Sequence, residues 1–331
     1  MKNKEKLLFI YTDLSSFVKG DLDILREKYQ VTTYRFHTHK SYKLILSLLR
    51  QFLFLLFHIW KFRKVYIWFG DYHSFLPVLF AKMTGKKSYL VIGGYDVCRI
   101  KSLNYGSFKN PLRGFMTLFS MKYCTLNLCV SKNVQRKVRW IAPKAHTIII
   151  FNSVNFRPSD QHIAKENIIL TVGNINSYQR ILIKGIDRFI HTACQLPQFQ
   201  FIIVGMTSEL LKQHNYDIPA NLQVYKFLPH EQLVGFYQKA KIYMQLSRSE
   251  SFCLTLAEAM FYNCIPIVTN VGGMPEVIGS QDLVINENKL DGLLPKIENI
   301  ILSENNAHEQ HERIKNYFTQ SAREKQLLSK L

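Results

Sequence analysis

Short apolar runs alternate with amphipathic segments along almost the whole chain. This alternation is typical of a parallel β-sheet covered by helices, because each buried strand leads into a helix that crosses back over the sheet. The pattern predicts strands at Leu7–Tyr11, Val65–Phe69, Ser88–Ile92, Asn127–Val130, Thr147–Phe151, Ile168–Val172, Phe201–Val204, Leu222–Val224, Ile242–Leu246 and Ile265–Thr269. It predicts helices that begin near Asp21, that end at Gly85, and that cover Ile186–Gln195, Glu231–Ala240 and Leu256–Tyr262.

The series of strands and helices starts twice, on either side of a polar junction near Pro158–Glu166. This repetition indicates an α/β protein with two doubly wound domains facing across a cleft, with ligands at the carboxyl ends of the strands. We place the N-terminal domain at residues 1–160 and the C-terminal domain at residues 161–311. The charged segment Ala307–Leu331 is predicted to be helical, and we expect its last part, about 312–331, to pack back on the N-terminal domain.

Leu44–Trp60 is strongly apolar but contains Arg50 near its middle and has basic residues on both flanks. One hypothesis is a buried helix of the first domain. A second is a helix in a membrane interface, with its basic flanks on lipid headgroups. A spanning helix needs ~20 mostly apolar residues, so this segment is a poor candidate for a true span.

Composition adds an asymmetry of charge. The chain of 331 residues is 47% hydrophobic and 20% charged, which is typical of a packed protein and excludes a disordered one. Residues 1–160 hold 27 Lys and Arg against 8 Asp and Glu, and this excess accounts for the whole net charge of +19. The N-terminal half is therefore expected to face an anionic partner: a membrane surface, a phosphorylated acceptor or nucleic acid.

The six cysteines are scattered, without a C-x-x-C pair or the spacing of metal ligands. Several lie in apolar runs, where cysteine behaves as a small hydrophobic residue. With no secretory signal pattern at the start of the sequence, we expect a reducing, cytoplasmic location.

Two glutamates eight residues apart mark the most informative segment. Glu250 follows a predicted strand, and Glu258 stands in the opening turns of a predicted helix. Backbone N–H groups at such a helix start suit a pyrophosphate. A carboxylate accepts hydrogen bonds from two hydroxyl groups, which suits Glu258 to a ribose diol and Glu250 to sugar hydroxyls. The alternative is a capping box formed by Thr255 and Glu258, which would give Glu258 only a structural role.

The surrounding residues resemble the E-x7-E signature of the retaining glycosyltransferases of family 4, which have the GT-B fold. The resemblance covers most of residues 168–280 in order. It is carried by Val172, Gly173, Lys184, Gly185, Ile186, Asp187, Ile203, Val204, Gly205, Phe227, Leu228, Pro229, Ser247, Glu250, Phe252, Glu258, Gly272, Gly273, Pro275 and Glu276.

The resemblance implies that Glu258 holds the donor ribose and Glu250 the transferred sugar, while Lys184 neutralises the diphosphate leaving group. It implies donor contacts from Gly173 and Leu228 and from the backbone amides of Ser251, Phe252, Cys253 and Leu254. The sequence departs from the family pattern at two places. Asn174 stands where the family often has a basic residue, and Arg180 in the following loop is the candidate for a second positive charge. Ser251 and Cys253 replace small glycines, so we expect a narrower sugar pocket.

The N-terminal half matches the family less well. Gly20 is expected to leave room for backbone near the diphosphate, and Lys19 and Asp71 to lie on the acceptor side. Asp96 is retained as a catalytic candidate, but Gly93 stands where the family has a histidine that contacts the transferred sugar. His73, after the strand Val65–Phe69, is the candidate to replace that histidine, the alternative being a structural residue.

The sequence thus predicts a retaining enzyme that moves a hexosyl or N-acetylhexosaminyl unit from a nucleotide-sugar to a membrane-associated glycan or glycolipid, as in capsular, lipopolysaccharide or exopolysaccharide biosynthesis. Such a protein would lie on the inner face of the cell membrane. We expect no cofactor and no metal, since we see no D-x-D pair of the kind that holds a metal-bound diphosphate in the other major transferase fold. Alternatives are a nucleotide-sugar 2-epimerase and a basic protein that binds nucleic acid or another anionic polymer. For nucleic acid there is no helix-turn-helix, zinc or RNP pattern, and for an NAD(P) enzyme no G-x-G-x-x-G follows a predicted strand.

Overall fold

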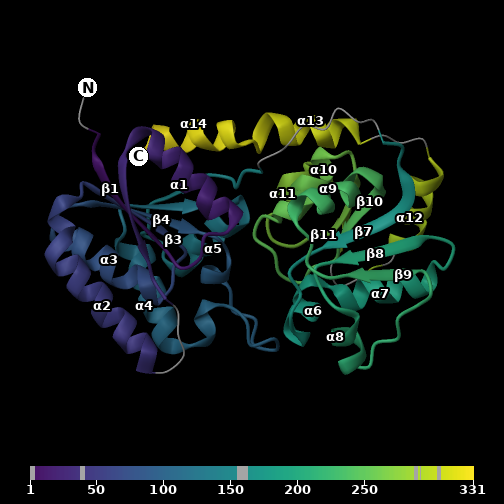
Figure 1. Cartoon of the computed structure of the whole chain (residues 1–331), viewed down its shortest axis with the longest axis horizontal. Coiled ribbons are helices and arrows are strands. Elements are labelled where there is room, and N and C mark those ends of the chain that lie inside the picture. Colours follow the sequence, from purple (N-terminus) through teal and green to yellow (C-terminus); the bar gives the residue numbers. More distant parts are fainter. Residues whose placement is uncertain (1–3, 38–41, 155–162, 287–289, 291, 304–306) are drawn as a thin grey trace. The chain divides into compact units, whose positions relative to one another are not determined.

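The computed structural model describes residues 4–37, 42–154, 163–286, 290, 292–303 and 307–331 (Figure 1). The chain divides into two compact units: unit 1 is Met1–Asn152 with Gln320–Leu331, and unit 2 is Ser153–Thr319. The domain boundary expected at residues 160 and 161 lies outside the described residues. The C-terminal segment forms two helices, α13 (His308–Tyr317) and α14 (Gln320–Lys330), of which α14 belongs to unit 1.

Unit 1 contains a parallel six-stranded sheet with the order β2-β1-β3-β4-β5-β6. Its central strands are almost fully buried because helices cover the sheet, which explains their continuous apolar runs. The edge strand β2 was not predicted, since its polar, half-exposed sequence carries no such run. The strands are β1 (Lys6–Tyr11), β2 (Gln30–Arg35), β3 (Lys64–Trp68), β4 (Lys87–Ile92), β5 (Leu126–Cys129) and β6 (Thr147–Ile149).

The helices of unit 1 are α1 (Ser16–Lys28), α2 (Tyr42–His58), α3 (Tyr72–Met83), α4 (Pro111–Tyr123), α5 (Lys132–Ile141) and α14, with single 3₁₀ turns η1 (Ile59–Lys61), η2 (Tyr95–Val97) and η3 (Ser107–Lys109). Helix α1 begins five residues before the predicted Asp21. The backbone N–H of Lys19 already donates to the Ser15 carbonyl, at 2.9 Å. Gly20 therefore lies inside α1, where a Cβ built on it would have no atom within 4 Å, and its expected place near the diphosphate stays a prediction.

Helix α2 contradicts the hypothesis of a buried helix. Its buried positions form one narrow stripe at a spacing of four residues, which η1 continues to Ile59, and large apolar side chains outside the stripe are exposed. The window Lys43–Lys61 is long and apolar enough to cross a membrane by length and composition alone, with a mean hydropathy of 1.5, and 22% of it is buried. The Gln51 amide donates to the His73 carbonyl at 2.9 Å and fixes α2 to α3.

Unit 2 contains a second parallel sheet with the order β12-β11-β10-β7-β8-β9. Its strands are β7 (Glu166–Val172), β8 (Gln200–Val204), β9 (Leu222–Tyr225), β10 (Ala240–Gln245), β11 (Ile265–Thr269) and β12 (Val284–Ile285). Its helices are α6 (Tyr178–Lys184), α7 (Ile186–Gln195), α8 (Ser208–Gln213), α9 (His230–Lys239), α10 (Leu254–Phe261), α11 (Met274–Ile278), α12 (Leu293–Leu302) and α13.

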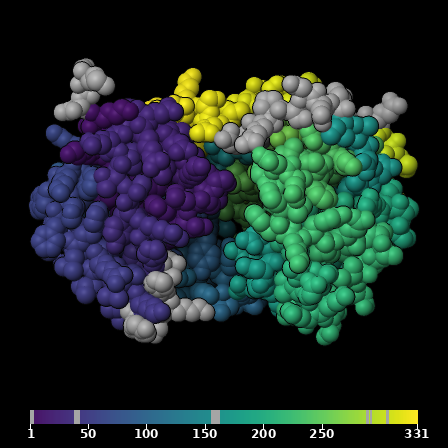
Figure 2. All heavy atoms as spheres, in the orientation of Figure 1, coloured from purple at the N-terminus to yellow at the C-terminus, as the bar shows by residue number. Residues whose placement is uncertain are grey.

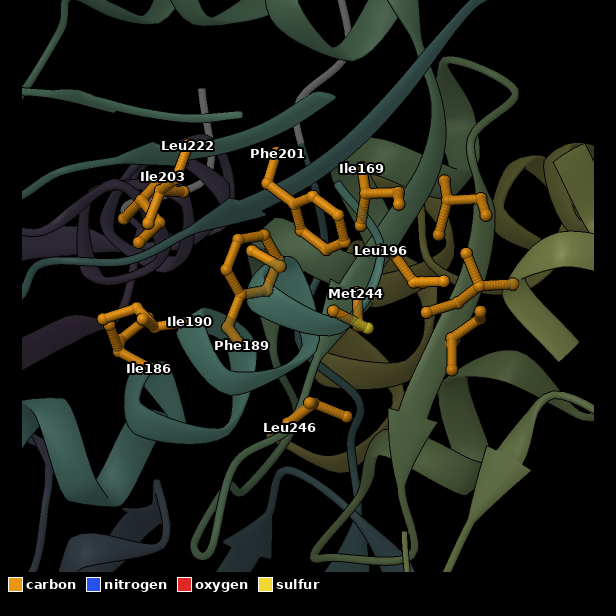
Figure 3. Close-up of a cluster of buried hydrophobic side chains, with 14 of the residues drawn as sticks. Ile169, Ile186, Phe189, Ile190, Leu196, Phe201, Ile203, Leu222, Met244 and Leu246 are labelled. Carbon is orange, nitrogen blue, oxygen red and sulfur yellow. The ribbon is translucent and has the colours of Figure 1, made fainter. Parts of the chain in front are cut away.

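The core of unit 2 forms where α7 packs on the sheet (Figure 3). Phe189 of α7 meets Phe201 of β8 edge to face, with ring centroids 5.4 Å apart, and Ile169 and Met244 of the two central strands belong to the same buried cluster. Helix α7 and strand β11 have the predicted bounds, because strong amphipathic and apolar patterns define both.

Counted from β7, the second sheet has the order 3-2-1-4-5-6 of a doubly wound fold, with the reversal of strand order between β7 and β10. The first sheet is also parallel and reverses its direction next to β1. The predicted fold class, two doubly wound α/β domains, is confirmed.

A buried ion pair ties the last helix to the rest of unit 1, and α14 lies beside α1 (Figures 1 and 2). The Arg323 guanidinium donates to both carboxylate oxygens of Asp21, at 2.5 and 2.7 Å. The Tyr66 hydroxyl donates to the same carboxylate at 2.6 Å, and Arg323 also donates to the carbonyls of Ile150 and Phe151. Both charges are thus fully hydrogen-bonded, which is what makes a buried pair tolerable.

Replacing Arg323→Ala leaves the Asp21 carboxylate buried without its counter-charge. We expect unit 1 to lose about 3–5 kcal/mol of stability. The three tryptophans, Trp60, Trp68 and Trp140, all lie in unit 1, so denaturation followed by tryptophan fluorescence reports this unit alone. The exposed Lys325→Ala on the same helix is the control, and an equal midpoint for both variants would contradict the role of the pair.

Candidate active site

The site predicted from the sequence lies at the reversal of strand order in unit 2. Strands β7 and β10 are neighbours there, so the loops that follow Val172 and Gln245 leave the same edge of the sheet. In doubly wound sheets this edge binds the ligand. Gly173 lies at the end of β7, and a Cβ built on it would lie 3.8 Å from Cε of Lys184.

Lys184 and Glu250 form an ion pair at this edge. Lys184 is the last residue of α6, and its Nζ lies 2.6 Å from Oε2 of Glu250. Their side chains are 17% and 13% exposed, so both charges remain open to a ligand. Burial acts to lower the pKa of Lys184, but the Glu250 carboxylate raises it above its ordinary value overall. Lys184 is therefore positively charged near neutral pH.

Glycines allow the loops of this edge to touch backbone to backbone. A Cβ on Gly185 would lie 1.9 Å from the Leu246 carbonyl oxygen, and one on Gly272 would lie 1.7 Å from the Glu250 carbonyl oxygen. A Cβ on Gly205 would lie 2.0 Å from the Gly173 carbonyl oxygen. All three have positive φ angles, which only glycine adopts at little cost.

Glu258 lies on α10 and does not form a capping box. The N-cap of α10 is Cys253, whose side chain makes no cap hydrogen bond, and Thr255 Oγ1 contacts the Tyr243 hydroxyl at 2.7 Å instead. One oxygen of Glu258 accepts from the Tyr237 hydroxyl at 3.0 Å, and the other lies 3.9 Å from Nε2 of His230. Burial raises the pKa of Glu258 to about 7, although the hydrogen bond from Tyr237 opposes this rise.

A buried polar network supports these residues, and the sequence reasoning missed it. The Tyr243 hydroxyl lies 2.8 Å from Oε1 of Gln245, whose amide nitrogen donates to the Lys184 carbonyl and to Oγ of Ser247. Polar residues at alternate positions of an otherwise apolar buried strand were the available signal. The network fixes the backbone of Lys184 to the end of β10.

Arg248 and Asp187 form a second support that the sequence reasoning did not identify. Two nitrogens of Arg248 lie 2.7 and 2.6 Å from the two carboxylate oxygens of Asp187, and Arg248 also donates to the Leu182 carbonyl at 2.7 Å. This pair joins the loop that carries Glu250 to the α6–α7 segment that carries Lys184.

The other residues that were predicted to contact the donor differ in their element and in their exposure. Arg180 lies in α6, not in a loop, which corrects the expectation. The Phe252 ring is buried against Phe318, at 5.4 Å between centroids, so only its backbone is available to a ligand. Asn174 is exposed, Leu228 and Ser251 are half-buried, Cys253 is buried with φ of 70°, and Leu254 opens α10.

In unit 1, Asp96 joins two loops rather than facing solvent. Its fully buried carboxylate accepts from the backbone N–H groups of Gly70, Gly93 and Gly94, at 3.1, 3.0 and 2.6 Å. Burial raises the pKa of Asp96 to about 6, and these donors act against the rise. A Cβ on Gly93 would lie 2.2 Å from the Phe69 ring, so Phe69 fills the space next to the position of the family histidine.

The structure does not support a catalytic role for His73. The side chain is 1% exposed, and its Nε2 lies 2.7 Å from the Trp68 carbonyl oxygen. Burial lowers the pKa of His73, which keeps the ring neutral. His73 is therefore a structural residue, because its buried ring is not available to meet a substrate.

The acceptor-side candidates are positioned by helices. Asp71 caps α3 and pairs with Arg113 at 3.0 Å, and Lys19 is exposed on α1. Within the residues that the structure describes, no group of three or more His, Cys, Asp or Glu side chains could hold a metal ion.

Solved structures match the fold over almost the whole chain. The sucrose-phosphate synthase of Thermosynechococcus elongatus superposes with a TM-score of 0.80 over 98% of both chains, at 15% identity. HepE of Anabaena in complex with UDP superposes with a TM-score of 0.73 over 99% of this chain and 100% of its own, at 12% identity. The protein thus has the GT-B fold of two Rossmann-like domains.

The family model of the group 1 glycosyl transferases matches residues 154–320, about half of the chain. The chain belongs to this family, which agrees with the predicted enzyme class, a glycosyltransferase.

Curated relatives match in sequence as well. A phosphatidylinositol N-acetylglucosaminyltransferase subunit of Arabidopsis thaliana is 24% identical over 54% of this chain and 40% of its own. An uncharacterised glycosyltransferase of Methanocaldococcus jannaschii is 27% identical over 59% of this chain and 55% of its own. The chain thus spans about half the length of these relatives.

Gly272→Ala tests the close contact of the loops. An alanine there has an unfavourable positive φ and a Cβ inside the Glu250 carbonyl, so we expect unit 2 to lose at least about 2 kcal/mol of stability. Gly235→Ala is the control, because Gly235 lies in α9 with no atom near its Cβ, and it should gain about 0.5–1 kcal/mol. Denaturation followed by far-UV circular dichroism separates the two variants.

Glu258 should make the stability of unit 2 fall as pH rises. Its pKa is raised from 4.5 to about 7 by folding, so the folded state binds the extra proton between these values. The contribution is complete below pH 4.5 and is lost by about pH 7, a difference of about 3 kcal/mol. In Glu258→Gln this slope should disappear, and in the exposed control Glu309→Gln it should remain. Denaturation curves at pH 4.5, 6 and 8 measure how the free energy of unfolding changes with pH. Equal slopes in all three proteins would contradict the assignment of this pH dependence to Glu258.

Proposed function

We propose that this protein is a retaining, nucleotide-sugar-dependent glycosyltransferase of family 4, which moves a hexosyl or N-acetylhexosaminyl unit to a membrane-associated glycan or glycolipid. The observation that carries the donor part is the ion pair of Lys184 and Glu250 at the strand reversal of unit 2, together with Glu258 on α10, the helix that follows. It combines a partly exposed cation, two carboxylates and the first N–H groups of α10, which suit a diphosphate between a ribose and a sugar.

Each group has one task in this proposal. Glu258 accepts hydrogen bonds from the ribose hydroxyls, while the amides of Ser251 to Leu254 meet the sugar and the phosphates. Lys184 exchanges its contact with Glu250 for the diphosphate and stabilises the charge that develops as the glycosidic bond breaks. Glu250, released from Lys184, binds hydroxyls of the transferred sugar.

The acceptor attacks from the face that the diphosphate leaves, and a diphosphate oxygen takes the acceptor proton, so the anomeric configuration is retained. The fixed charge of Lys184 and the helix amides supply the positive potential, and on this basis we expect no metal requirement.

The acceptor part is supported by charge and by relatives. The excess of 19 basic residues in the first 160 residues favours an anionic or membrane-bound acceptor. Relatives from Arabidopsis thaliana and Schizosaccharomyces pombe are named as phosphatidylinositol N-acetylglucosaminyltransferase subunits, which favours N-acetylhexosaminyl transfer next to a membrane. We propose a role in surface polysaccharide or lipopolysaccharide biosynthesis, on the cytoplasmic face of the cell membrane.

Calorimetric titration with UDP, GDP, ADP and their sugar adducts tests the donor site. We expect one nucleotide family to bind. Glu258→Gln should weaken both the nucleoside and the diphosphate about 10–100-fold, because it loses charged hydrogen bonds to the ribose. Lys184→Gln should weaken only the diphosphate, since the nucleoside does not reach it. Lys212→Ala, an exposed lysine on α8, is the matched control.

The outcomes distinguish the alternatives. Product formation with retained anomeric configuration, unchanged by a metal chelator, supports the complete proposal. Conversion of the donor sugar at its 2-position without an acceptor would favour an epimerase. If the folded protein binds none of the nucleotides, the donor assignment is wrong.

A further inference from the structure

Helix α2 has the reverse of the usual distribution of polar and apolar side chains. Its buried stripe contains two polar residues, Ser47 and Gln51, and the apolar Leu55. Its exposed side carries large apolar residues, and we call this set, with Trp60 of η1, the α2 face: Ile45 71%, Leu46 42%, Leu49 52%, Phe52 40%, Leu53 45%, Leu56 43%, Phe57 67% and Trp60 67% exposed. An apolar patch of this extent on one helix marks a surface that is covered in use.

The surroundings of the α2 face are cationic. From Lys28 to Asn152, both included, the sequence contains 21 Lys and Arg and only two acids, Asp71 and Asp96. Asp96 is fully buried, and Asp71 is paired with Arg113, so neither offers an exposed negative charge. Exposed basic residues lie along and beyond the helix: Lys43, Arg50, Lys61 and Arg63.

The positive charge around the α2 face distinguishes between two possible partners, a second copy of the chain and a lipid bilayer. A second copy of the chain would bring the same cationic surface against this one, and the like charges would repel. An anionic bilayer offers acyl chains for the apolar side chains and phosphate groups for the flanking cations. The apolar side chains of the α2 face and the basic residues around it would then both contact groups of matching chemistry.

The contacts of α2 with the rest of unit 1 determine how it meets lipid. The Gln51 amide donates to the His73 carbonyl, and the Phe52 ring packs on Phe80 of α3 at 5.5 Å. Crossing the bilayer would separate this hydrogen bond and place Gln51 and Arg50 among acyl chains. Lying flat keeps the inner contacts, and a helix of 17 residues then presents about 26 Å of apolar length to the interface.

We propose that the α2 face is a lipid-docking surface, which inserts into the headgroup region of an anionic bilayer while α2 stays packed on unit 1. The surface contains none of the residues named for the donor, so it goes beyond the transfer reaction itself. It provides the part of the proposed function that brings the enzyme to a membrane-bound acceptor.

Trp60 provides a direct probe of this insertion. In a Trp140→Phe background, the remaining tryptophans are Trp60 on the α2 face and Trp68, which is buried. With vesicles of phosphatidylglycerol and phosphatidylcholine we expect a blue shift of the emission and quenching by lipids brominated on the acyl chains. Vesicles of phosphatidylcholine alone should give at least about tenfold weaker binding, since they lack the anionic headgroups. Absence of quenching in anionic vesicles would overturn the proposal.

Variants separate docking from folding and from donor binding. Leu49→Asp with Phe57→Asp should lower the partition into anionic vesicles at least about tenfold, since two exposed apolar contacts become charged. Leu302→Asp, an 82% exposed leucine at the end of α12, is the matched control and should leave it unchanged. Lys61→Gln with Arg63→Gln should weaken binding to anionic vesicles and reduce the salt dependence of that binding.

Nucleotide titration of the same variants checks the donor site separately. Unchanged nucleotide affinity with lost vesicle binding in Leu49→Asp with Phe57→Asp supports the proposal. If the wild-type protein binds vesicles but no nucleotide, the donor assignment is wrong and the docking surface stands. If the wild-type protein instead forms a dimer that Leu49→Asp with Phe57→Asp dissociates, and vesicles are not bound, the α2 face is a protein interface and the proposal is wrong.

Discussion

The close contact of backbones around the strand reversal of unit 2 is the constraint on which the site depends. Gly185 and Gly272 let their loops touch the carbonyls of Leu246 and Glu250 at distances that any side chain would prevent. Because these loops carry or adjoin Lys184 and Glu250, the glycines set the separation of the two charges. The hydrogen-bond network of Tyr243 and Gln245 also fixes the backbone of Lys184 to the end of β10.

The two units use charge in opposite ways. In unit 2 the charges of the site are few, half-buried and paired, as in Lys184 and Glu250, so their positions are fixed by local contacts. In unit 1 the exposed charges are many and mostly of one sign, while the buried Asp21–Arg323 pair is fully hydrogen-bonded and serves only the fold. A diphosphate needs precise local contacts, whereas a membrane surface needs a broad field.

Sequence patterns predicted the bounds of elements best where a strand is buried on both faces or a helix is strongly amphipathic. β11 and α7 have their predicted bounds, and most other strands differ from prediction by one or two residues. The edge strand β2 and the polar start of α1 lack an apolar run and were missed or misplaced. The burial of His73 was not predicted, because a position after a strand does not reveal burial, which depends on α2 and on a contact with Trp68.

The sequence by itself determined the fold class, membership of a glycosyltransferase family and the order of the candidate donor residues, because periodicity and spaced motifs are local properties of the chain. Only the tertiary structure decided which side of α2 is exposed, that Thr255 contacts Tyr243 rather than capping α10, and that Phe69 fills the space beside Gly93. Each of these depends on contacts between residues far apart in the sequence, or on which face of a helix the rest of its unit covers. Such facts follow from packing in three dimensions, and no local pattern encodes them.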